Sequence, residues 1–424
     1  MCAAHDLRSL LRAIEHEERS STGLLRLTAY ESRPSRLVQR LVASPLATDY
    51  HIGSLAEHAR KKVVDAHGLI LRGLPGVASL EEAATRFAQH ALTAGGVDFR
   101  PLSGVHAILA TLITFTEPGD LVLSISPEHG GHFATRYLLQ RLGRRSAYLP
   151  WHDELFTVDA ARFERESGRH PSPKMILFDH GLPLAAQPVR RLRTIVGADT
   201  LLVYDASHTL GLMLGKRFQD PLGEGADIVQ GNTHKSFPGV QKAVIASNTA
   251  ARARKIGDAL SNGLVSSQHT HHAIATYVAF LEMEEFGERY ADAMLVNARA
   301  LAGELAGLGA RVIGPAGCPT SSHEVFVASG TELPARQWAE RLIRAGISVN
   351  ARRVHGVDAL RIGVQSVTRT GMGVPEMALI ARTLVSFTES DRPSRSQLSL
   401  IRALAGDFAE VQYSFDLRLG LTAA

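Results

Sequence analysis

Short apolar segments alternate with amphipathic segments between residues 80 and 265, and this alternation restricts the fold more than any other feature of the chain. The apolar segments, which we interpret as strands, are Leu121–Ser126, Met175–Asp179, Leu201–Asp205, Ile228–Gly231 and Ala243–Ser247. The amphipathic segments predict helices, which include Ser79–Leu92 with Ser79 as its N-cap, His106–Phe115, Gly131–Arg141 and Val189–Val196. Buried strands that alternate with helices are typical of an α/β fold with an open, mostly parallel sheet flanked by helices.

The pattern changes after residue 270. A long helix is predicted from Ala273 to Leu308, and the strands beyond it are shorter. These later elements are strands at Arg311–Ile313, Glu324–Ala328, Ser348–Ala351 and Leu360–Val364, and helices at Ala335–Ala345 and Pro375–Phe387. We therefore predict an N-terminal helix and arm over residues 1–60, a large domain over 61–285 and a smaller C-terminal α+β domain over 286–424.

The first segment predicts an amphipathic helix, because Leu7, Leu10, Leu11 and Ile14 recur at helical spacing between charged residues. An apolar stripe of this kind needs a partner surface. Residues 20–60 contain Gly, Pro and Ser without a long periodic run, so we expect an arm with short turns.

Composition narrows the class of protein. The 46 basic and 42 acidic residues leave a formal charge of +4 without a basic, aromatic-interleaved run, so nucleic-acid binding is not expected. The two cysteines, Cys2 and Cys318, fit a reducing compartment. The N-terminus lacks the apolar core of a signal peptide, and apolar runs such as Ala107–Phe115 are too short to cross a bilayer. We expect a cytoplasmic protein with no membrane partner.

Two strand ends carry residues that suit pyridoxal 5'-phosphate. Lys235 follows the strand Ile228–Gly231, and Asp205 ends the strand before it. A lysine amine forms a Schiff base with this cofactor, and an aspartate keeps the ring nitrogen protonated so that the ring accepts electrons. The alternative for Lys235 is a surface lysine after a strand.

Neighbouring turns offer further contacts. Ser103 and Gly104 precede a helix whose N-terminus favours an anion such as phosphate, although Ser-Gly is also an ordinary helix cap. His132 follows two glycines, which suits an imidazole lying flat on an aromatic ring, or else a flexible surface loop. His208 comes three residues after Asp205, where it can reach a ring hydroxyl.

Arg361 begins an apolar strand, where a guanidinium is costly unless an anion pairs with it. A substrate carboxylate held by two hydrogen bonds would be such an anion, and a structural salt bridge is the alternative. The tract Gln268–His272 looks like a metal-binding sequence, but no cysteine or carboxylate pattern completes it. We expect a polar loop or a helix start there, and no metal.

Together these residues resemble the serine hydroxymethyltransferase family of fold-type I pyridoxal phosphate enzymes, over residues 24–390. The matching segments, in the family's order, are Leu27–Ser32, Ser103-Gly104, His129–His132, Asp205–His208, Thr233–Lys235 and Leu360–Gly363. Within the family the chain is similar to the L-threonine transaldolases of natural-product pathways. The segments that carry this similarity are Gly130–Ala134, Ala226–Lys235, Ile362–Arg369 and Tyr413–Asp416.

The resemblance implies a role for each candidate site residue. The catalytic residues would be Lys235, Asp205, His132 and Tyr50. The cofactor-binding residues would be Ser103, Gly104, Val105, His132, Asp205, His208, Thr233, His234, Lys235, Ser266 and Ser267. The substrate-binding residues would be Arg361, Tyr50 and Glu31.

Two departures from the family bear on the reaction. Hydroxymethyltransferases carry Tyr-x-Glu in an early loop, where the glutamate handles protons in folate-dependent transfer, but here Tyr50 is followed by His51 and Ile52. Val105 replaces the second serine of the phosphate turn. Loss of the glutamate fits a transaldolase. Such an enzyme would cleave L-threonine to acetaldehyde and a glycyl quinonoid, which adds to a second aldehyde and gives a β-hydroxy-α-amino acid.

Several functions and one assembly follow from the resemblance. A folate-dependent hydroxymethyltransferase and a threonine aldolase that releases glycine are the enzymatic alternatives, and a non-catalytic binding protein on the same scaffold is a third. The family also implies a homodimer or a dimer of dimers. In that assembly Tyr50 would enter the partner's site, and Ser266 or Ser267 would reach the partner's phosphate. The alternative for Tyr50 is a packing residue.

Overall fold

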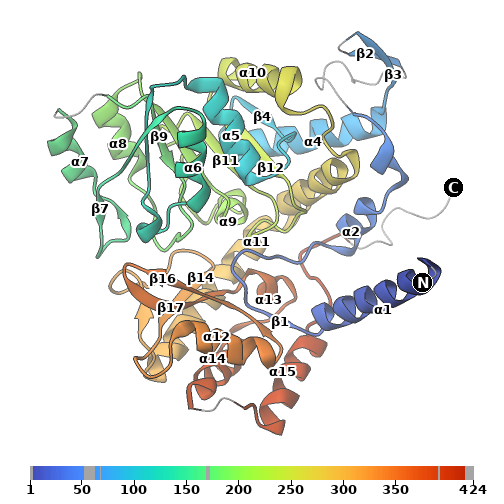
Figure 1. Cartoon of the computed structure of the whole chain (residues 1–424), viewed down its shortest axis with the longest axis vertical. Helices are drawn as coiled ribbons and strands as arrows, with labels where there is room; N and C mark the ends of the chain where they lie inside the picture. Colours follow the sequence, from blue (N-terminus) through green and yellow to red (C-terminus); the bar gives the residue numbers. More distant parts are fainter. Residues whose placement is uncertain (1–2, 52–62, 67, 169–171, 390–391, 416–424) are drawn as a thin grey trace.

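The computed structural model describes residues 3–51, 63–66, 68–168, 172–389 and 392–415 (Figure 1). The larger sheet of this part of the chain has seven strands in the order β4-β12-β11-β10-β9-β5-β6. Their bounds are Gly96–Asp98, Ala243–Ser247, Ile228–Asn232, Leu201–Asp205, Met175–Phe178, Leu121–Ser124 and Arg145–Tyr148 in that order. β12 runs antiparallel to both of its neighbours, and the remaining pairs are parallel. The predicted open, mostly parallel sheet is confirmed.

Helices bury both faces of this sheet. In β9, Ile176 packs into one apolar cluster and its neighbour Leu177 into another, because successive side chains of a strand point to opposite faces. The first cluster includes side chains of α4, α8 and α11, and the second includes side chains of α5, α6 and α10. These helices are Pro75–Ala91, Val189–Val196, Thr270–Gly307, Gly104–Phe115, Phe133–Arg141 and Ala250–Ala259. Two further helices, α7 (Ala160–Ser167) and α9 (Leu210–Leu214), complete this part.

The C-terminal part is built on a four-stranded antiparallel sheet in the order β13-β14-β17-β16. The strands are Val312–Ile313, Glu324–Ala328, Val357–Gly363 and Asn350–Val354, and the helices are α12 (Ala335–Arg344), α13 (Gln365–Arg369), α14 (Val374–Glu389) and α15 (Arg395–Asp407). Figure 1 shows α11 running between the two parts. The predicted domain boundary at residue 285 falls inside α11, and the division into three parts stays a prediction.

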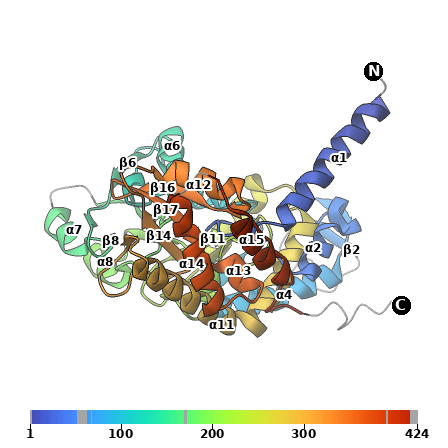
Figure 2. The ribbon, with the colours of Figure 1, turned by 90° about the horizontal axis from the view of Figure 1, so that it is seen from below.

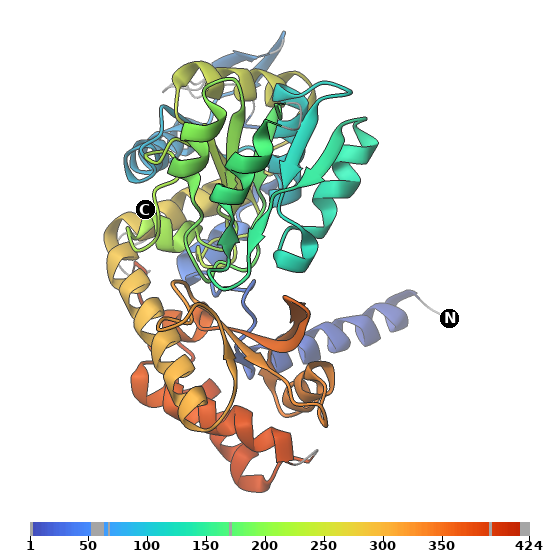
Figure 3. The ribbon, with the colours of Figure 1, turned by 90° about the vertical axis from the view of Figure 1, so that its left-hand side faces the viewer.

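The N-terminal helix α1 (Ala3–Thr22) extends away from the rest of the chain in Figures 2 and 3. Its side chains Leu7, Leu10, Leu11 and Ile14 are between 48% and 62% exposed, so the chain itself leaves the predicted apolar stripe uncovered. After α1 the chain forms β1 (Leu25–Arg26), which pairs with β15 (Ile347–Ser348), then α2 (Arg36–Val42), η1 (Pro45–Thr48) and the hairpin β2-β3 (Val63–Ala66, Leu69–Arg72).

Several predicted helix starts were wrong, including that of α5, which begins at Gly104 rather than His106. α4 begins at Pro75, because a proline favours the first helical position, and Ser79 lies inside the helix with its hydroxyl donating to the Pro75 carbonyl at 2.9 Å. α6 begins at Phe133 rather than Gly131, with His132 as its N-cap. α11 begins at Thr270, so the Gln268–His272 tract is a helix start. None of the described helices is long and apolar enough to cross a membrane.

Candidate active site

Lys235 lies three residues beyond the C-terminal end of β11, and its side chain is only 9% exposed. Its Nζ lies 3.0 Å from Nε2 of His208, which follows the neighbouring parallel strand β10. No carboxylate of the described residues forms an ion pair with this amine. Burial lowers the pKa of Lys235 to about 8, with the nearby Asp205 carboxylate partly opposing that shift. A buried amine with a lowered pKa and no ion-pair partner is suited to covalent chemistry rather than to stability.

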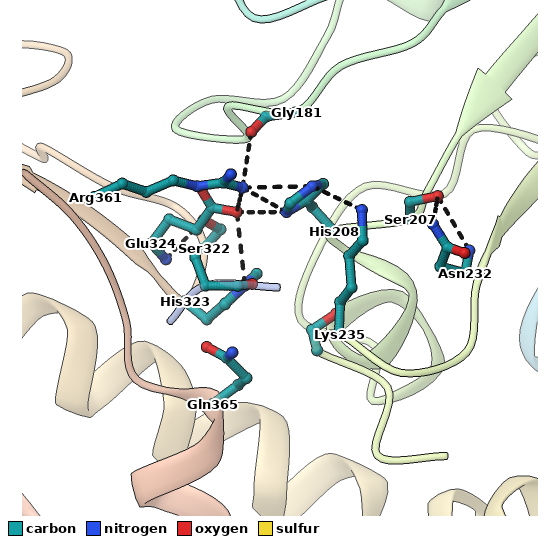
Figure 4. A network of polar contacts seen from close by, with 12 residues as sticks. Gly181, Ser207, His208, Asn232, Lys235, Ser322, His323, Glu324, Arg361 and Gln365 are labelled. Atoms are coloured by element: carbon teal, nitrogen blue, oxygen red, sulfur yellow. Dashed lines mark hydrogen bonds and ion pairs between the residues drawn. The ribbon is translucent and has the colours of Figure 1, made fainter. Parts of the chain in front are cut away.

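A buried polar network connects Lys235 to the C-terminal part (Figure 4). Nδ1 of His208 donates to Oε1 of Glu324 at 2.6 Å. Arg361 donates to both oxygens of the same carboxylate, through Nε at 2.9 Å and Nη2 at 2.8 Å, and Nη2 also donates to the Gly181 carbonyl at 3.1 Å. Since the Nδ1 proton of His208 is held by Glu324, we assign Nε2 as the acceptor that faces Lys235.

The charges within this network are matched. Burial alone would raise the pKa of Glu324, but the Arg361 guanidinium and His208 together hold it well below its usual value. Burial, reinforced by the charge of Lys235, lowers the pKa of His208 well below its usual value, so the imidazole is neutral near neutral pH. The salt bridge considered as an alternative for Arg361 is therefore present. Nη1 of Arg361 makes no hydrogen bond to the described residues and stays free for a ligand.

A second set of contacts links Asp205 to the N-terminus of α5. Oδ1 of Asp205 accepts the N–H of Ser207 at 2.8 Å, and Oδ2 has no hydrogen-bond partner among the described residues. Asn232 donates through Nδ2 to the Ser207 hydroxyl at 3.2 Å, and its Oδ1 accepts the N–H of Gly104 at 2.8 Å. A Cβ on Gly104 would lie 2.5 Å from Asn232, so only glycine permits this approach. Ser103 caps α5 by accepting the N–H of His106.

His132 lies close to the same centre. Burial lowers the pKa of its imidazole, while Asp205 acts to raise it and Lys235 to lower it, which places the ring near both charged groups. The backbone N–H of His132 donates to Oδ2 of Asp179 at 3.1 Å, and Oδ1 of Asp179 accepts the backbone N–H of Ile125 at 3.0 Å. Asp179 therefore fixes the glycine-rich turn that carries His132.

These residues fit pyridoxal phosphate. The amine of Lys235 is available for a Schiff base, and the free Oδ2 of Asp205 suits the protonated nitrogen of a pyridine ring. Nε2 of His208 is the acceptor that faces the amine at 3.0 Å. The start of α5, with Ser103 at its cap, is suited to a phosphate.

The other predicted site residues make no contact with the Lys235 network that the hydrogen bonds of the described residues show. Thr233 is buried and donates to the Val240 carbonyl, whereas His234 is half-buried next to Lys235 in the chain, with a pKa lowered to about 4 mainly by burial. Glu31 pairs with Arg26 at 3.5 Å. The remaining predicted residues have exposed side chains: Tyr50, Val105, Ser266 and Ser267. Among the described residues, no hydrogen bond joins Tyr50, Ser266 or Ser267 to the Lys235 network.

One group of metal-type ligands occurs among the described residues. Ligand atoms of His208, His323 and Glu324 all lie within 4.8 Å of one another. Both oxygens of Glu324 already accept hydrogen bonds from Arg361, and a cation would have to compete with that guanidinium. We therefore interpret the group as part of the polar network.

Sequence reasoning missed Glu324, Asp179 and Asn232. Glu324 had the same signal as Arg361, namely a charged residue at the start of an apolar strand. The two strands are antiparallel neighbours with Glu324 opposite Gly363, so Arg361 lies two residues along the same face. Pairing the two lone charges from the sequence would have found the salt bridge.

The whole chain is similar to known proteins. Residues 9–384 match the family model described as serine hydroxymethyltransferase. The chain is 37% identical to a fluorothreonine transaldolase of Streptantibioticus cattleyicolor over 399 residues, which are 91% of this chain and 61% of that longer protein. A serine hydroxymethyltransferase of Methanopyrus kandleri is 31% identical over 99% of this chain and 98% of its own.

A solved structure is also similar. The crystal structure of L-threonine transaldolase from Pseudomonas fluorescens in its internal aldimine state superimposes with a TM-score of 0.89 and 28% sequence identity. The alignment covers 99% of this chain and 96% of that one. The similarity therefore includes both sheets and the helix α11 between them.

Proposed function

The chain belongs to the serine hydroxymethyltransferase family of pyridoxal-phosphate-dependent enzymes, and from this premise we propose that it is an L-threonine transaldolase. It cleaves the Cα–Cβ bond of L-threonine, releases acetaldehyde and transfers the glycine unit to a second aldehyde, which gives a β-hydroxy-α-amino acid. The observation that carries the proposal is the shared similarity to two transaldolases over more than nine-tenths of this chain. We also propose a cytoplasmic setting and a role in natural-product biosynthesis, in line with the cysteine content and with that branch of the family.

When bound, pyridoxal phosphate supplies a ring that accepts the electrons of the bond being broken. Lys235 would hold the cofactor through Nζ, and Oδ2 of Asp205 would keep a proton on the ring nitrogen. His132 would contact the bound cofactor, and His208 presents Nε2 beside the amine. Each of these roles is supported by the placement of the side chain at the C-terminal edge of the parallel strands, where open α/β sheets bind their ligands.

Arg361 positions the substrate. Its free Nη1 takes an oxygen of the amino-acid carboxylate, while Glu324 keeps the guanidinium in place through Nε and Nη2. A fixed carboxylate would restrict rotation about the N–Cα bond of the amino acid and would thereby select which bond at Cα is broken. Orienting a reactant in this way lowers the activation free energy by about several kcal/mol.

The absence of a folate-type glutamate supports transfer to an aldehyde. Ile52 takes the place of that glutamate in the sequence and lies outside the described residues. A hydroxymethyltransferase is the second candidate, because the relative from Methanopyrus kandleri matches along nearly its whole length. A threonine aldolase that releases glycine is the third.

The assay that tests the proposal supplies holoenzyme with L-threonine and benzaldehyde. A transaldolase forms acetaldehyde and phenylserine in equal amounts, whereas an aldolase forms acetaldehyde and free glycine. A hydroxymethyltransferase forms little of either and instead converts serine in the presence of tetrahydrofolate.

We further propose a homodimer or a dimer of dimers. The exposed stripe of α1 is an apolar surface that the chain itself does not cover. Tyr50 is 57% exposed, and the loop that carries Ser266 and Ser267 is exposed just before α11. In the assembly Tyr50 enters the partner's site, and Ser266 or Ser267 contacts the partner's phosphate.

A further inference from the structure

The strand β16 brings a second guanidinium to the candidate active site. Asn350 of β16 lies opposite Arg361 of β17, and Arg352 is two residues further along β16. Because side chains two residues apart in a strand share a face, Arg352 lies on the same face of the sheet as Arg361. Arg353, the next residue, belongs to the opposite face and is exposed.

Arg352 borders the same piece of backbone as Arg361 and His208. A Cβ built on Gly181 would lie 3.9 Å from Nη1 of Arg352 and 3.9 Å from Nε2 of His208. The Gly181 carbonyl accepts a hydrogen bond from Arg361. Since Nε2 of His208 lies 3.0 Å from Nζ of Lys235, Arg352 faces the place where a substrate amine would react.

No acidic residue in the described part of the chain forms an ion pair with Arg352. The Nε of Arg352 donates a hydrogen bond to the Arg353 carbonyl at 3.4 Å. Glu324 is already held by Arg361 and His208. The pKa of Arg352 is lowered to about 10, mainly by burial and then by the charge of Arg361, so the side chain remains cationic at neutral pH at a cost in free energy. The half-buried guanidinium of Arg352 has no anionic partner, whereas Arg361 beside it is paired with Glu324. A second anion bound near Arg352 would therefore be stabilised.

We propose that Arg352 binds the α-carboxylate of the amino-acid substrate, together with Nη1 of Arg361. The proposal rests on the proposed function only in taking the ligand to be an α-amino acid. The carboxylate is attached to the carbon that bears the amine, so it must bind close to Lys235. The space beside Gly181 is close to Lys235, because it also borders His208. With the carboxylate bound, two guanidinium groups face two carboxylates, Glu324 and the substrate. The site is then electrically balanced.

Binding measurements test this assignment without turnover. Calorimetric titration of holoenzyme with glycine, which has no Cα–Cβ bond to cleave, should show an affinity about 10- to 100-fold weaker in Arg352→Gln, the range expected when one hydrogen bond to a charged group is lost. Arg353→Gln is the matched control and should bind glycine as the unaltered protein does. Isopropanolamine, which is threonine without its carboxylate, should bind equally well to all three proteins. Arg352→Lys keeps the charge and should recover part of the lost affinity.

A second arm separates the two sources of a carboxylate. The KM for benzaldehyde and for para-carboxybenzaldehyde should be equally unaffected by Arg352→Gln if the residue serves the amino acid. Unchanged glycine affinity in Arg352→Gln would overturn the proposal, and so would a rise in KM confined to the carboxylated aldehyde. Because the calorimetric result does not depend on transfer to an aldehyde, a failure of the transaldolase assay leaves this test intact.

Discussion

The amine of Lys235 lies 3.0 Å from Nε2 of His208, and it has no ion pair with the described residues. The imidazole cannot turn freely, because Glu324 accepts its Nδ1 proton at 2.6 Å. The same carboxylate anchors Arg361. A single buried carboxylate therefore orients both the group beside the amine and the group proposed to bind the substrate.

Removing this carboxylate should destabilise the protein. Glu324→Ala leaves the Arg361 guanidinium buried without its partner, and the free energy of unfolding of the apoenzyme should fall by about 3–5 kcal/mol in urea titrations. Glu340→Ala is the control, since Glu340 forms an exposed ion pair with Arg336 and should cost less than about 1 kcal/mol. Equal effects of the two substitutions would contradict the buried network.

The contribution of Glu324 should also depend on pH. Its pKa in the folded state lies well below the ordinary value, so its stabilising effect is fully present above that ordinary value. The effect is lost as the pH falls from there toward the folded-state pKa. The difference in stability between the unaltered apoenzyme and Glu324→Ala should therefore shrink in acid and stay constant near neutral pH.

Lys235 should show the opposite dependence. Burial lowers its pKa from 10.5 to about 8, so the folded apoenzyme bears a cost when the amine is protonated. This loss of folding free energy is full below about pH 8 and vanishes above the unfolded-state pKa of Lys235. Apoenzyme carrying Lys235→Met should thus be more stable near neutral pH, by about 3 kcal/mol at most, and this advantage should disappear as the pH rises through that window. An advantage independent of pH would rule out a titrating buried amine.

Asp205→Asn tests the partner of the ring nitrogen. The asparagine keeps the shape of the side chain but cannot stabilise a positive charge on the ring, so the cofactor's absorbance should persist while carbon-acid chemistry slows. Exchange of the α-proton of glycine in heavy water, followed by NMR, should fall by more than about a hundredfold. An undiminished exchange rate would assign the ring proton to another acid.

Many strands of this fold could be predicted from the sequence, because a run of apolar residues indicates a buried strand. The strands Leu201–Asp205, Ala243–Ser247 and Glu324–Ala328 have the predicted bounds, since each is buried along most of its length. β6 was missed because Arg145–Tyr148 is an exposed edge strand with no apolar run. Periodicity does not reveal such a strand, since its pairing is set by the neighbouring β5.

The candidate site was predicted in part. Residues at the ends of β10 and β11, such as Asp205 and Lys235, were found because strand ends are recognisable in the sequence. The partners Glu324 and Asn232 were not, because they meet their targets only through sheet pairing and a close backbone approach at Gly104. Contacts between distant segments need the three-dimensional arrangement.

Complementation between variants tests the shared site. If Tyr50 serves the partner's site, Lys235→Ala and Tyr50→Phe are each inactive, but mixed subunits contain one intact site in half of the dimers. Equal mixtures that have been allowed to exchange subunits should recover up to about a quarter of full activity. A fully active Tyr50→Phe protein, or an active monomer by light scattering, would disprove the shared site.

The central claim is that the glycine unit is transferred between two aldehydes without being released. The most direct test measures how two isotopic labels enter threonine. Holoenzyme is incubated with L-threonine, acetaldehyde labelled with heavy carbon and glycine labelled with heavy nitrogen, and the threonine is then examined by mass spectrometry. A transaldolase keeps the glycine unit bound between the two aldehydes, so the account predicts that heavy carbon enters threonine much faster than heavy nitrogen does. Entry of both labels at similar rates would show that glycine is released and would contradict the account.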